Sequence, residues 1–293
     1  MNILGVIPAR YGSVRFPGKP LADICGKPMI WWVYERCKEI RQVNEIIVAT
    51  DDGRILDVCK KFGIHAMMTS SRHKNAASRL QEVSRTCNAD FYVQINGDEP
   101  LVDIAAVEKC IPTEIPQDVE FGTNIITEMT EPSQVLDVSN IKVVFDANMN
   151  ALYMSRSPIP TPFGTLDFKY YKHVGIIGYN KKMLDFYAQS TPGIFEKIEG
   201  IDTLRFLDYG KTLRLVLVEN LKTLSVDTPK DLDICRRLIE TQEDTSIRID
   251  GGGINLEQYS CPCVLPARRR HDEDTMRDSR TIQLIAASRK TDC

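Results

Sequence analysis

The first hundred residues alternate between short apolar segments and segments with helical periodicity, and this alternation constrains the fold more than any other feature. Segments of the first kind predict strands at 2–9, 45–52, 65–70 and 91–100. Segments of the second kind predict helices at 29–41, 53–63 and 77–87. Because short links join strands and helices in turn, the sequence predicts an α/β fold with a parallel sheet covered by helices on both faces.

The pattern changes after these first hundred residues. Residues 121–180 show strand-like apolar segments and turn signals typical of hairpins, so we expect a β-rich subregion inserted before the last sheet elements. A strand at 212–220 and a helix at 225–242 follow, and periodic apolar residues become sparse beyond this helix. We therefore expect one domain over 1–242 and a mobile or loosely docked tail over 243–293.

Charge and composition argue against several classes of protein. The formal net charge of −3 gives no reason to expect a basic surface for nucleic acid. No apolar run reaches the roughly 18 residues that a membrane-spanning helix needs, and the N-terminal residues do not resemble a signal peptide. Nine cysteines, an odd number without regular spacing, argue against a disulfide framework. We expect a cytoplasmic protein that neither binds nucleic acid nor inserts into a membrane.

The loop after the first predicted strand concentrates cations and glycines. It contains Arg10, Gly12, Ser13, Arg15 and Lys19. Glycine lets a backbone approach a phosphate closely, main-chain N–H groups can point at it, and cations neutralise its charge. The loop therefore predicts a phosphate-binding site. Its spacing differs from both common nucleotide-binding glycine motifs, and a solvated cationic loop is the alternative.

Two aspartates far apart in the sequence lie where a metal ion could bind. Asp98 ends an apolar strand in the sequence INGDEP, and Asp227 follows the predicted strand at 212–220 and lies at the start of the last predicted helix, in SVDTPKDL. Ligands of open α/β sheets bind beyond the carboxyl ends of the strands. Mg²⁺ prefers oxygen ligands and binds through one or two carboxylates together with substrate phosphates. The alternatives are a solvated turn for Asp98 and a helix N-cap for Asp227.

Seven segments together resemble a known family. They read, in order, IPARYGSVRFPGKPL, GKPMI, ATDD, NGDEP, IKVVFDANMNALYMSRSPIP, HVGIIGY and VDTPKDL. This set is similar to the 3-deoxy-manno-octulosonate cytidylyltransferase (CMP-Kdo synthetase) family, and the similarity covers residues 2–239. The resemblance implies a mixed, mainly parallel sheet of the nucleotide-diphospho-sugar transferase type and a homodimer. It also implies a Mg²⁺-dependent reaction that joins CTP to a sugar acid and releases pyrophosphate.

The resemblance implies roles for individual residues as well. Catalysis would rest on Lys19, Arg10, Arg15 and Asp98, and Mg²⁺ would be bound by Asp98 and Asp227. The nucleotide would contact Arg10, Gly12, Ser13, Arg15, Lys19, Thr69, His73 and Arg79. The acidic acceptor would contact Asn96, Arg156, His173 and Asp202.

Residues 69–79 depart from the family pattern for the base and ribose. Thr69, His73 and Arg79 match it, whereas residues 70, 72 and 75–78 differ and lose hydroxyl and carboxylate groups. A polar base edge left unpaired costs about 1–3 kcal/mol. The sequence therefore predicts selection of cytosine less strongly than it predicts the phosphate chemistry. The acceptor side departs too, at positions 96, 177 and 202–203. Two alternatives therefore stay open. One is the same transfer to a different acid (an amino-sugar acid or a phosphonate) or from a different NTP; the other is a weakly active nucleotide-binding relative.

Overall fold

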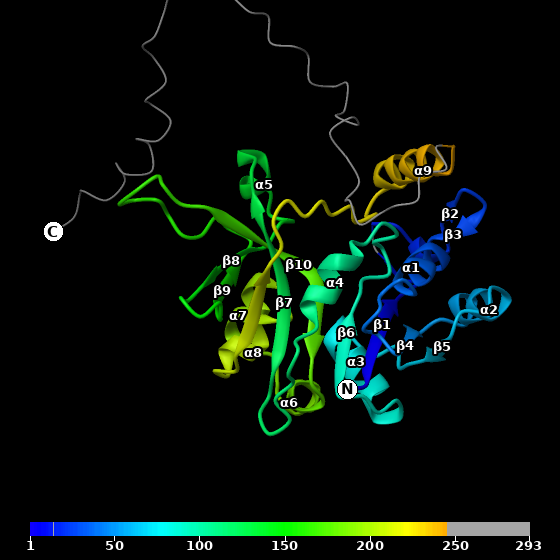
Figure 1. Cartoon of the computed structure of the whole chain (residues 1–293), viewed down its shortest axis with the longest axis horizontal. Helices are drawn as coiled ribbons and strands as arrows, with labels where there is room; N and C mark the ends of the chain where they lie inside the picture. The colour runs from blue at the N-terminus through cyan, green and yellow to red at the C-terminus, as the bar shows by residue number, and fades with distance from the viewer. Residues whose placement is uncertain (14, 245–293) are drawn as a thin grey trace, which may run out of the picture. The chain divides into compact units, whose positions relative to one another are not determined.

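A mixed sheet organises the chain, for which the computed structural model describes residues 1–13 and 15–244 (Figure 1). Seven of its nine strands follow the order β11-β7-β10-β6-β1-β4-β5, and β8 and β9 branch from β10. The strands are β1 (Ile3–Ala9), β4 (Glu45–Thr50), β5 (Ala66–Met68), β6 (Phe91–Gln94), β7 (Gly122–Met129), β8 (Lys142–Phe145), β9 (Ala151–Ser155), β10 (Tyr170–Tyr179) and β11 (Leu213–Leu217). A separate small sheet pairs β2 (Asp23–Ile24) with β3 (Lys27–Pro28).

The pairing confirms the predicted mixed, mainly parallel sheet. Strand β1 pairs in parallel with β4 and β6, β4 with β5, and β11 with β7. Only β10 among the seven path strands runs antiparallel to its neighbours, β6 and β7. The β-rich segment predicted at 121–180 therefore divides: β7 and β10 lie inside the main sheet, while β8 and β9 form a hairpin beside it.

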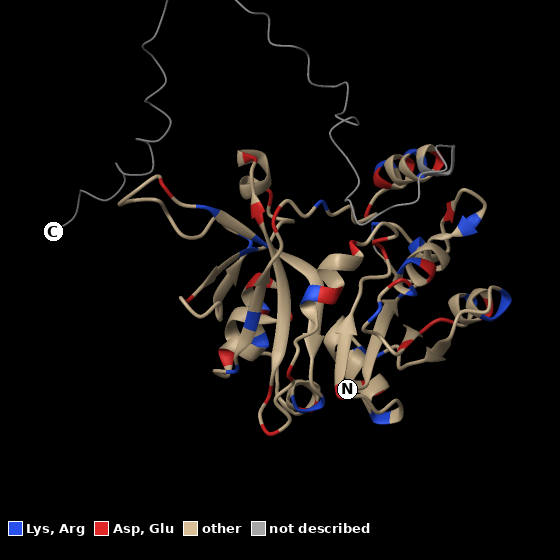
Figure 2. Cartoon of the chain, viewed as in Figure 1, with Lys and Arg blue, Asp and Glu red and all other residues tan. Residues whose placement is uncertain are grey.

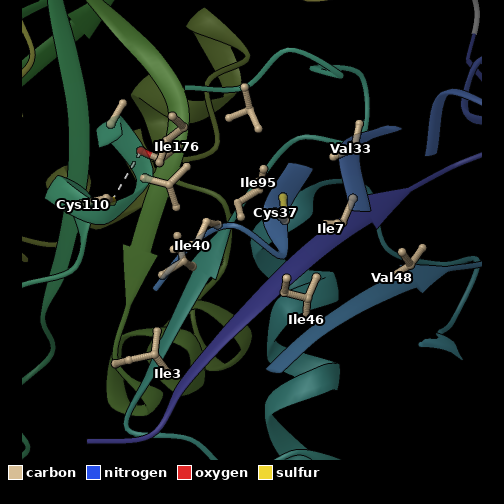
Figure 3. Packing of buried hydrophobic residues seen from close by; sticks show 14 of the residues in the cluster. Ile3, Ile7, Val33, Cys37, Ile40, Ile46, Val48, Ile95, Cys110 and Ile176 are labelled. Carbon is tan, nitrogen blue, oxygen red and sulfur yellow. Dashed lines mark hydrogen bonds between the residues drawn. The ribbon is translucent and has the colours of Figure 1, made fainter. Parts of the chain in front are cut away.

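Helices cover both faces of the sheet. Their bounds are η1 (Lys19–Leu21, a 3₁₀ turn), α1 (Met29–Cys37), α2 (Gly53–Lys61), α3 (Ala76–Thr86), α4 (Ile104–Cys110), α5 (Pro132–Leu136), α6 (Lys181–Gln189), α7 (Ile194–Glu199), α8 (Leu204–Asp208) and α9 (Pro229–Asp244). One apolar cluster joins α1, α2 and α4 to the sheet (Figure 3). A second joins α3, α6 and α8 to the opposite face. Strand β1 contributes Ile3 and Ile7 to the first cluster and Leu4 and Val6 to the second, because successive side chains of a strand point to opposite faces.

A third apolar cluster brings a late part of the chain to an early one. Val226 and the α9 residues Leu232 and Cys235 pack against Ile24 and Met29. This contact holds the segment before α9 next to the loop that follows β1. Figure 2 shows acidic and basic residues side by side on α4 and α9. None of the helices in the described part of the chain is long and apolar enough to cross a membrane.

Element ends differ from the prediction where the chain turns toward the sheet edge. Strand β6 ends at Gln94, whereas the prediction extended it to 100, and the intervening residues turn along the carboxyl edge of the sheet. Asp227 follows an irregular stretch after β11 rather than a strand directly. The predicted tail over 243–293 lies outside the described residues, except for its first two positions, which end α9.

Candidate active site

The loop after β1 folds back on itself and places Lys19 at the carboxyl edge of the sheet. The carbonyl oxygen of Tyr11 accepts hydrogen bonds from the main-chain N–H groups of Ser13 and Gly18, each 2.9 Å long. Gly18 has φ +71°, a left-handed conformation that glycine adopts without steric cost. Lys19 then begins the turn η1. The glycine at 18 therefore fixes the point at which the Lys19 side chain leaves the loop.

Two distant carboxylates meet at the ammonium group of Lys19. Its Nζ lies 2.6 Å from Oδ2 of Asp98 and 3.0 Å from Oδ1 of Asp227. The Lys19 side chain is only 12% exposed. Burial opposes its charge, but the adjacent Asp98 and Asp227 carboxylates outweigh burial and raise the pKa of Lys19. Arg15 adds a second cation, with Nη2 3.1 Å from the same oxygen of Asp227.

The start of α9 leaves the Asp227 carboxylate available to this site. Oδ2 of Asp231 accepts hydrogen bonds from the N–H groups of Asp227 (3.1 Å) and Thr228 (2.8 Å). The Thr228 hydroxyl in turn accepts from the N–H of Asp231 at 3.3 Å. Together with Pro229 at the first helical position, this is a capping box. Thr228 and Asp231 therefore cap the helix, and the alternative of Asp227 as the N-cap is wrong.

A cavity of about 430 Å³ opens over the loop and the two carboxylates. Nine of the predicted site residues line it: Arg10, Gly12, Ser13, Arg15, Lys19, Arg79, Asn96, Asp98 and Asp227. The cations and glycine-rich backbone of the β1 loop border this cavity together with the two carboxylates, which pair with Lys19. Such an arrangement can hold a polyphosphate and a divalent cation together.

A second cavity of about 500 Å³ adjoins the first. The two share Arg15, Asn96 and Asp227 as lining residues. His173 on β10 lines only the second cavity, and burial lowers its pKa to about 4, so the ring is neutral near pH 7. Among the described residues, Nε2 of His173 has no hydrogen-bond partner. We call the first cavity the nucleotide chamber and the second the acceptor chamber.

Three ionisable groups that line the acceptor chamber were not among the predicted site residues: Glu99, Lys172 and the capping residue Asp231. Glu99 accepts hydrogen bonds from Asn96 Nδ2 and Ser225 Oγ, both 3.3 Å, on Oε1. Burial, and then the neighbouring Asp98, raises its pKa to about 7. The sequence signals were the second carboxylate of INGDEP and a lysine directly before His173 inside a strand pattern.

Several residues of segment 69–79 that were predicted to bind the nucleotide instead interact with other parts of the protein. The Thr69 hydroxyl donates to the carbonyl oxygen of Thr50 at 3.0 Å, and Nε2 of His73 is paired with Glu82. Neither Thr69 nor His73 lines either chamber. Arg79 does line the nucleotide chamber, and its Nη2 lies 2.7 Å from Oδ2 of Asp51. Their roles toward a nucleotide stay predictions.

Arg156 and Asp202 also lie outside the lining of both chambers. Nε of Arg156 donates to the carbonyl oxygen of Glu199 at 2.8 Å, and Nη1 donates to that of Val138 at 2.9 Å. Burial, and then the Glu196 carboxylate, raises the pKa of Asp202. Of the four residues predicted to bind the acceptor, the structure brings together Asn96 and His173.

Comparisons with known proteins find relatives that span most of this chain. A family model described as cytidylyltransferase matches residues 4–214. The 8-amino-3,8-dideoxy-manno-octulosonate cytidylyltransferase of Shewanella pealeana is 39% identical over 239 residues, which cover 80% of this chain and 97% of that protein. The 3-deoxy-manno-octulosonate cytidylyltransferase of Solibacter usitatus is 40% identical over 241 residues, 82% of this chain and 95% of the relative.

A solved structure gives the same result for the fold. The structure of a CMP:2-keto-3-deoxy-manno-octonic acid synthetase complexed with CTP superposes with a TM-score of 0.77 at 37% identity. The match covers 83% of this chain and 100% of the synthetase. An inositol-1-phosphate CTP transferase from T. maritima, 13% identical with a TM-score of 0.59, shares the fold.

Proposed function

Because the chain belongs to the cytidylyltransferase family, we propose that it transfers CMP from CTP to a sugar acid of the 3-deoxy-octulosonate type and releases pyrophosphate. One observation carries the proposal most directly. Asp98 and Asp227, separated by more than a hundred residues, converge on Lys19 in the nucleotide chamber, beside the junction where Asp227 borders both chambers. That junction is where a triphosphate and an acceptor hydroxyl have to approach each other.

The residues of the junction suit this reaction. A hydroxyl oxygen of the acceptor attacks the α-phosphorus of CTP and gives up its proton to water, the new P–O bond forms, and the bond to pyrophosphate breaks. Arg10, Arg15 and Lys19 stabilise the negative charge that builds on the leaving pyrophosphate, and positioning supplies much of the remaining rate. Arg15 reaches both chambers, so it can restrain the nucleotide and the acceptor side together.

Asp98 and Asp227 fit a Mg²⁺ site. Both offer hard oxygen ligands, and both already lie within 3.0 Å of one cationic group, the Lys19 ammonium. Two carboxylates together with substrate phosphates and water satisfy the preference of Mg²⁺. When bound, the ion polarises phosphate and hydroxyl oxygens. The carboxylates orient it, and Lys19 remains beside them to neutralise the triphosphate.

Differences from the family pattern on the acceptor side bear on the identity of the acid. The relatives named above include enzymes for 3-deoxy-manno-octulosonate and for its 8-amino derivative. Asn96 stands where the family has glutamine, and Ile177 stands where it has tyrosine. Fewer hydroxyl-binding groups favour a less hydroxylated or amino-substituted acid within this class.

A screen of nucleotides and acids tests the proposal. Pyrophosphate release is measured with CTP, ATP, GTP and UTP, each combined with 3-deoxy-manno-octulosonate, its 8-amino derivative and simpler 2-keto acids. We expect release only with CTP and an octulosonate acid, and with Mg²⁺ present. Release driven by another nucleotide would contradict the CTP assignment. Absence of release with every acid would favour a relative that only binds nucleotide.

We further propose a homodimer, which the family resemblance implies. Leu152 on β9 and Ile194 and Ile198 on α7 are exposed, and Tyr153 and Phe195 bring these elements together through ring centroids 5.2 Å apart. A second copy of the chain would bury these apolar side chains. Light scattering coupled to size exclusion should give twice the mass of one chain, and a mass of one chain at micromolar concentration would contradict the dimer.

A further inference from the structure

Lys172 places an ammonium group in the acceptor chamber. It lies on β10, directly before His173, and it lines this chamber together with Asn96 and Glu99. Its Nζ donates a hydrogen bond of 3.3 Å to the hydroxyl of Thr223, another lining residue. The side chain is therefore oriented by a neutral partner at the wall of the chamber.

The charge of Lys172 is not neutralised by a direct ion pair within the described residues. Burial lowers its pKa, and the carboxylates of Glu99 and then Asp137 partly oppose this effect. A half-buried ammonium in a cavity gains most from an anion that enters and forms a charge-assisted hydrogen bond with it.

The other cations near this chamber are less available to an acceptor. Arg15 already pairs with Asp227 at the junction. His173 is neutral near pH 7 because burial lowers its pKa. Arg156, the arginine that the family resemblance assigns to the acceptor, donates to main-chain carbonyl oxygens and lines neither chamber. Among the residues that line the acceptor chamber, Lys172 is thus the charged cation without a direct ion pair.

We propose that Lys172 binds the carboxylate of the acceptor and sets the preference of the enzyme for acids. This inference rests on the proposed function, since it assigns the acid group of that same acceptor. Thr223 is the positioning residue, because its hydroxyl holds the ammonium at the wall of the acceptor chamber. Lys172 is a specificity-determining residue, separate from the residues that contact the triphosphate.

The test compares an octulosonate acid with its carboxamide in the intact protein. The carboxamide keeps the shape of the acid and removes its charge. We expect the unaltered enzyme to favour the acid in kcat/KM. In Lys172→Met the value for the acid should fall about 10- to 100-fold, the loss of one charge-assisted hydrogen bond. The value for the carboxamide should change little, and KM for CTP should stay the same. Lys172→Arg should recover part of the preference for the acid.

Three further variants make the assignment specific. In Arg156→Met the preference for the acid over the carboxamide should remain. If Arg156→Met loses this preference and Lys172→Met keeps it, the inference is overturned. Lys169→Met is the matched control, because Lys169 precedes the same strand, is 61% exposed and pairs with Glu128 away from the chamber. Thermal unfolding of each variant separates loss of recognition from loss of fold, and Lys172→Gln provides a second neutral replacement.

Calorimetric binding of the acid and the carboxamide separates this inference from the proposed function. If the unaltered protein releases no pyrophosphate with any acid, the proposed function fails. The role of Lys172 would still be supported by tighter binding of the acid that disappears in Lys172→Met. Equal binding of acid and carboxamide by the unaltered protein would overturn the role of Lys172. So would a preference for the acid in Lys172→Met as strong as that of the unaltered protein.

Discussion

The main-chain N–H of Val226 donates a hydrogen bond of 2.8 Å to the carbonyl oxygen of Asp98. This single bond joins the turn after β6 to the segment before α9, and it sets Asp227 beside Asp98. Val226 is fully buried in the cluster that α9 forms with β2 and α1. The two proposed metal ligands are therefore held together by backbone pairing and core packing, independently of any bound ion.

Lys19→Gln should lower the rate of pyrophosphate release by about 10² or more, because removal of one preorganised charge contact has an effect of that order. KM for the acceptor should change less than kcat, since Lys19 lines only the nucleotide chamber. The matched control is Lys38→Gln, which removes an exposed lysine that pairs with Glu35 on the protein surface. A comparable rate loss in both variants would contradict a specific role for Lys19.

Asp227 and Asp231 should separate activity from stability. Asp227→Asn should reduce activity by about 10² with little change in the free energy of unfolding. Asp231→Ala should lower that free energy by about 0.5–2 kcal/mol through loss of the helix cap, with a smaller effect on rate. Urea unfolding and steady-state kinetics of both variants check this. The opposite pattern would mean that Asp227 serves the helix and Asp231 serves the reaction.

Gly175→Ala should weaken use of the acceptor. A Cβ at Gly175 would overlap Nδ2 of Asn96, so the amide that borders both chambers has to move. A displacement of about 1 Å near a reacting centre can cost up to about 10² in rate. Gly164→Ala is the control, because a Cβ there meets no atom within 4 Å. Unchanged kinetics in Gly175→Ala would show that the Asn96 position is unimportant.

His173 should make the fold sensitive to mild acid. Burial lowers its pKa from 6.5 to about 4. Between these values the unfolded chain binds the proton and the folded chain does not, so the free energy of unfolding falls as pH drops through this range. The full contribution is about 3 kcal/mol.

Urea unfolding at pH 7.5, 6, 5 and 4.5 measures this effect in the unaltered protein and in His173→Asn. The two proteins should differ in the slope of stability against pH below 6.5 and agree in slope above pH 7. Identical slopes in the acid range would contradict a neutral, buried His173.

The sequence predicted the scaffold, and it predicted that the loop after β1 and Asp98 lie at one edge of the sheet, for physical reasons that are local. Strand β1 is apolar at nearly every position because both of its faces are buried, and Arg10, Arg15 and Lys19 follow it directly. Parallel strands end at the same edge, so the approach of Asp98 to this loop followed from topology.

The parts that sequence reasoning missed depend on contacts between distant residues. Whether Asp227 caps a helix or faces a cavity is decided by Asp231, which takes over the cap. Arg156 has the chemistry of an anion anchor, yet carbonyl oxygens of Glu199 and Val138 engage it. The sequence position of Lys172 inside a strand does not reveal that this strand borders a cavity.

We propose that Asp98 and Asp227 act as one unit beside the junction of the two chambers. The most direct measurement is the rate of pyrophosphate release from CTP and an octulosonate acid in D98N, D227N and the double variant. We predict that each single variant loses about 10² in kcat and that the double variant loses little more, because residues acting as a unit are strongly non-additive. Losses that multiply in the double variant, or a D98N enzyme with unaltered rate, would contradict the account.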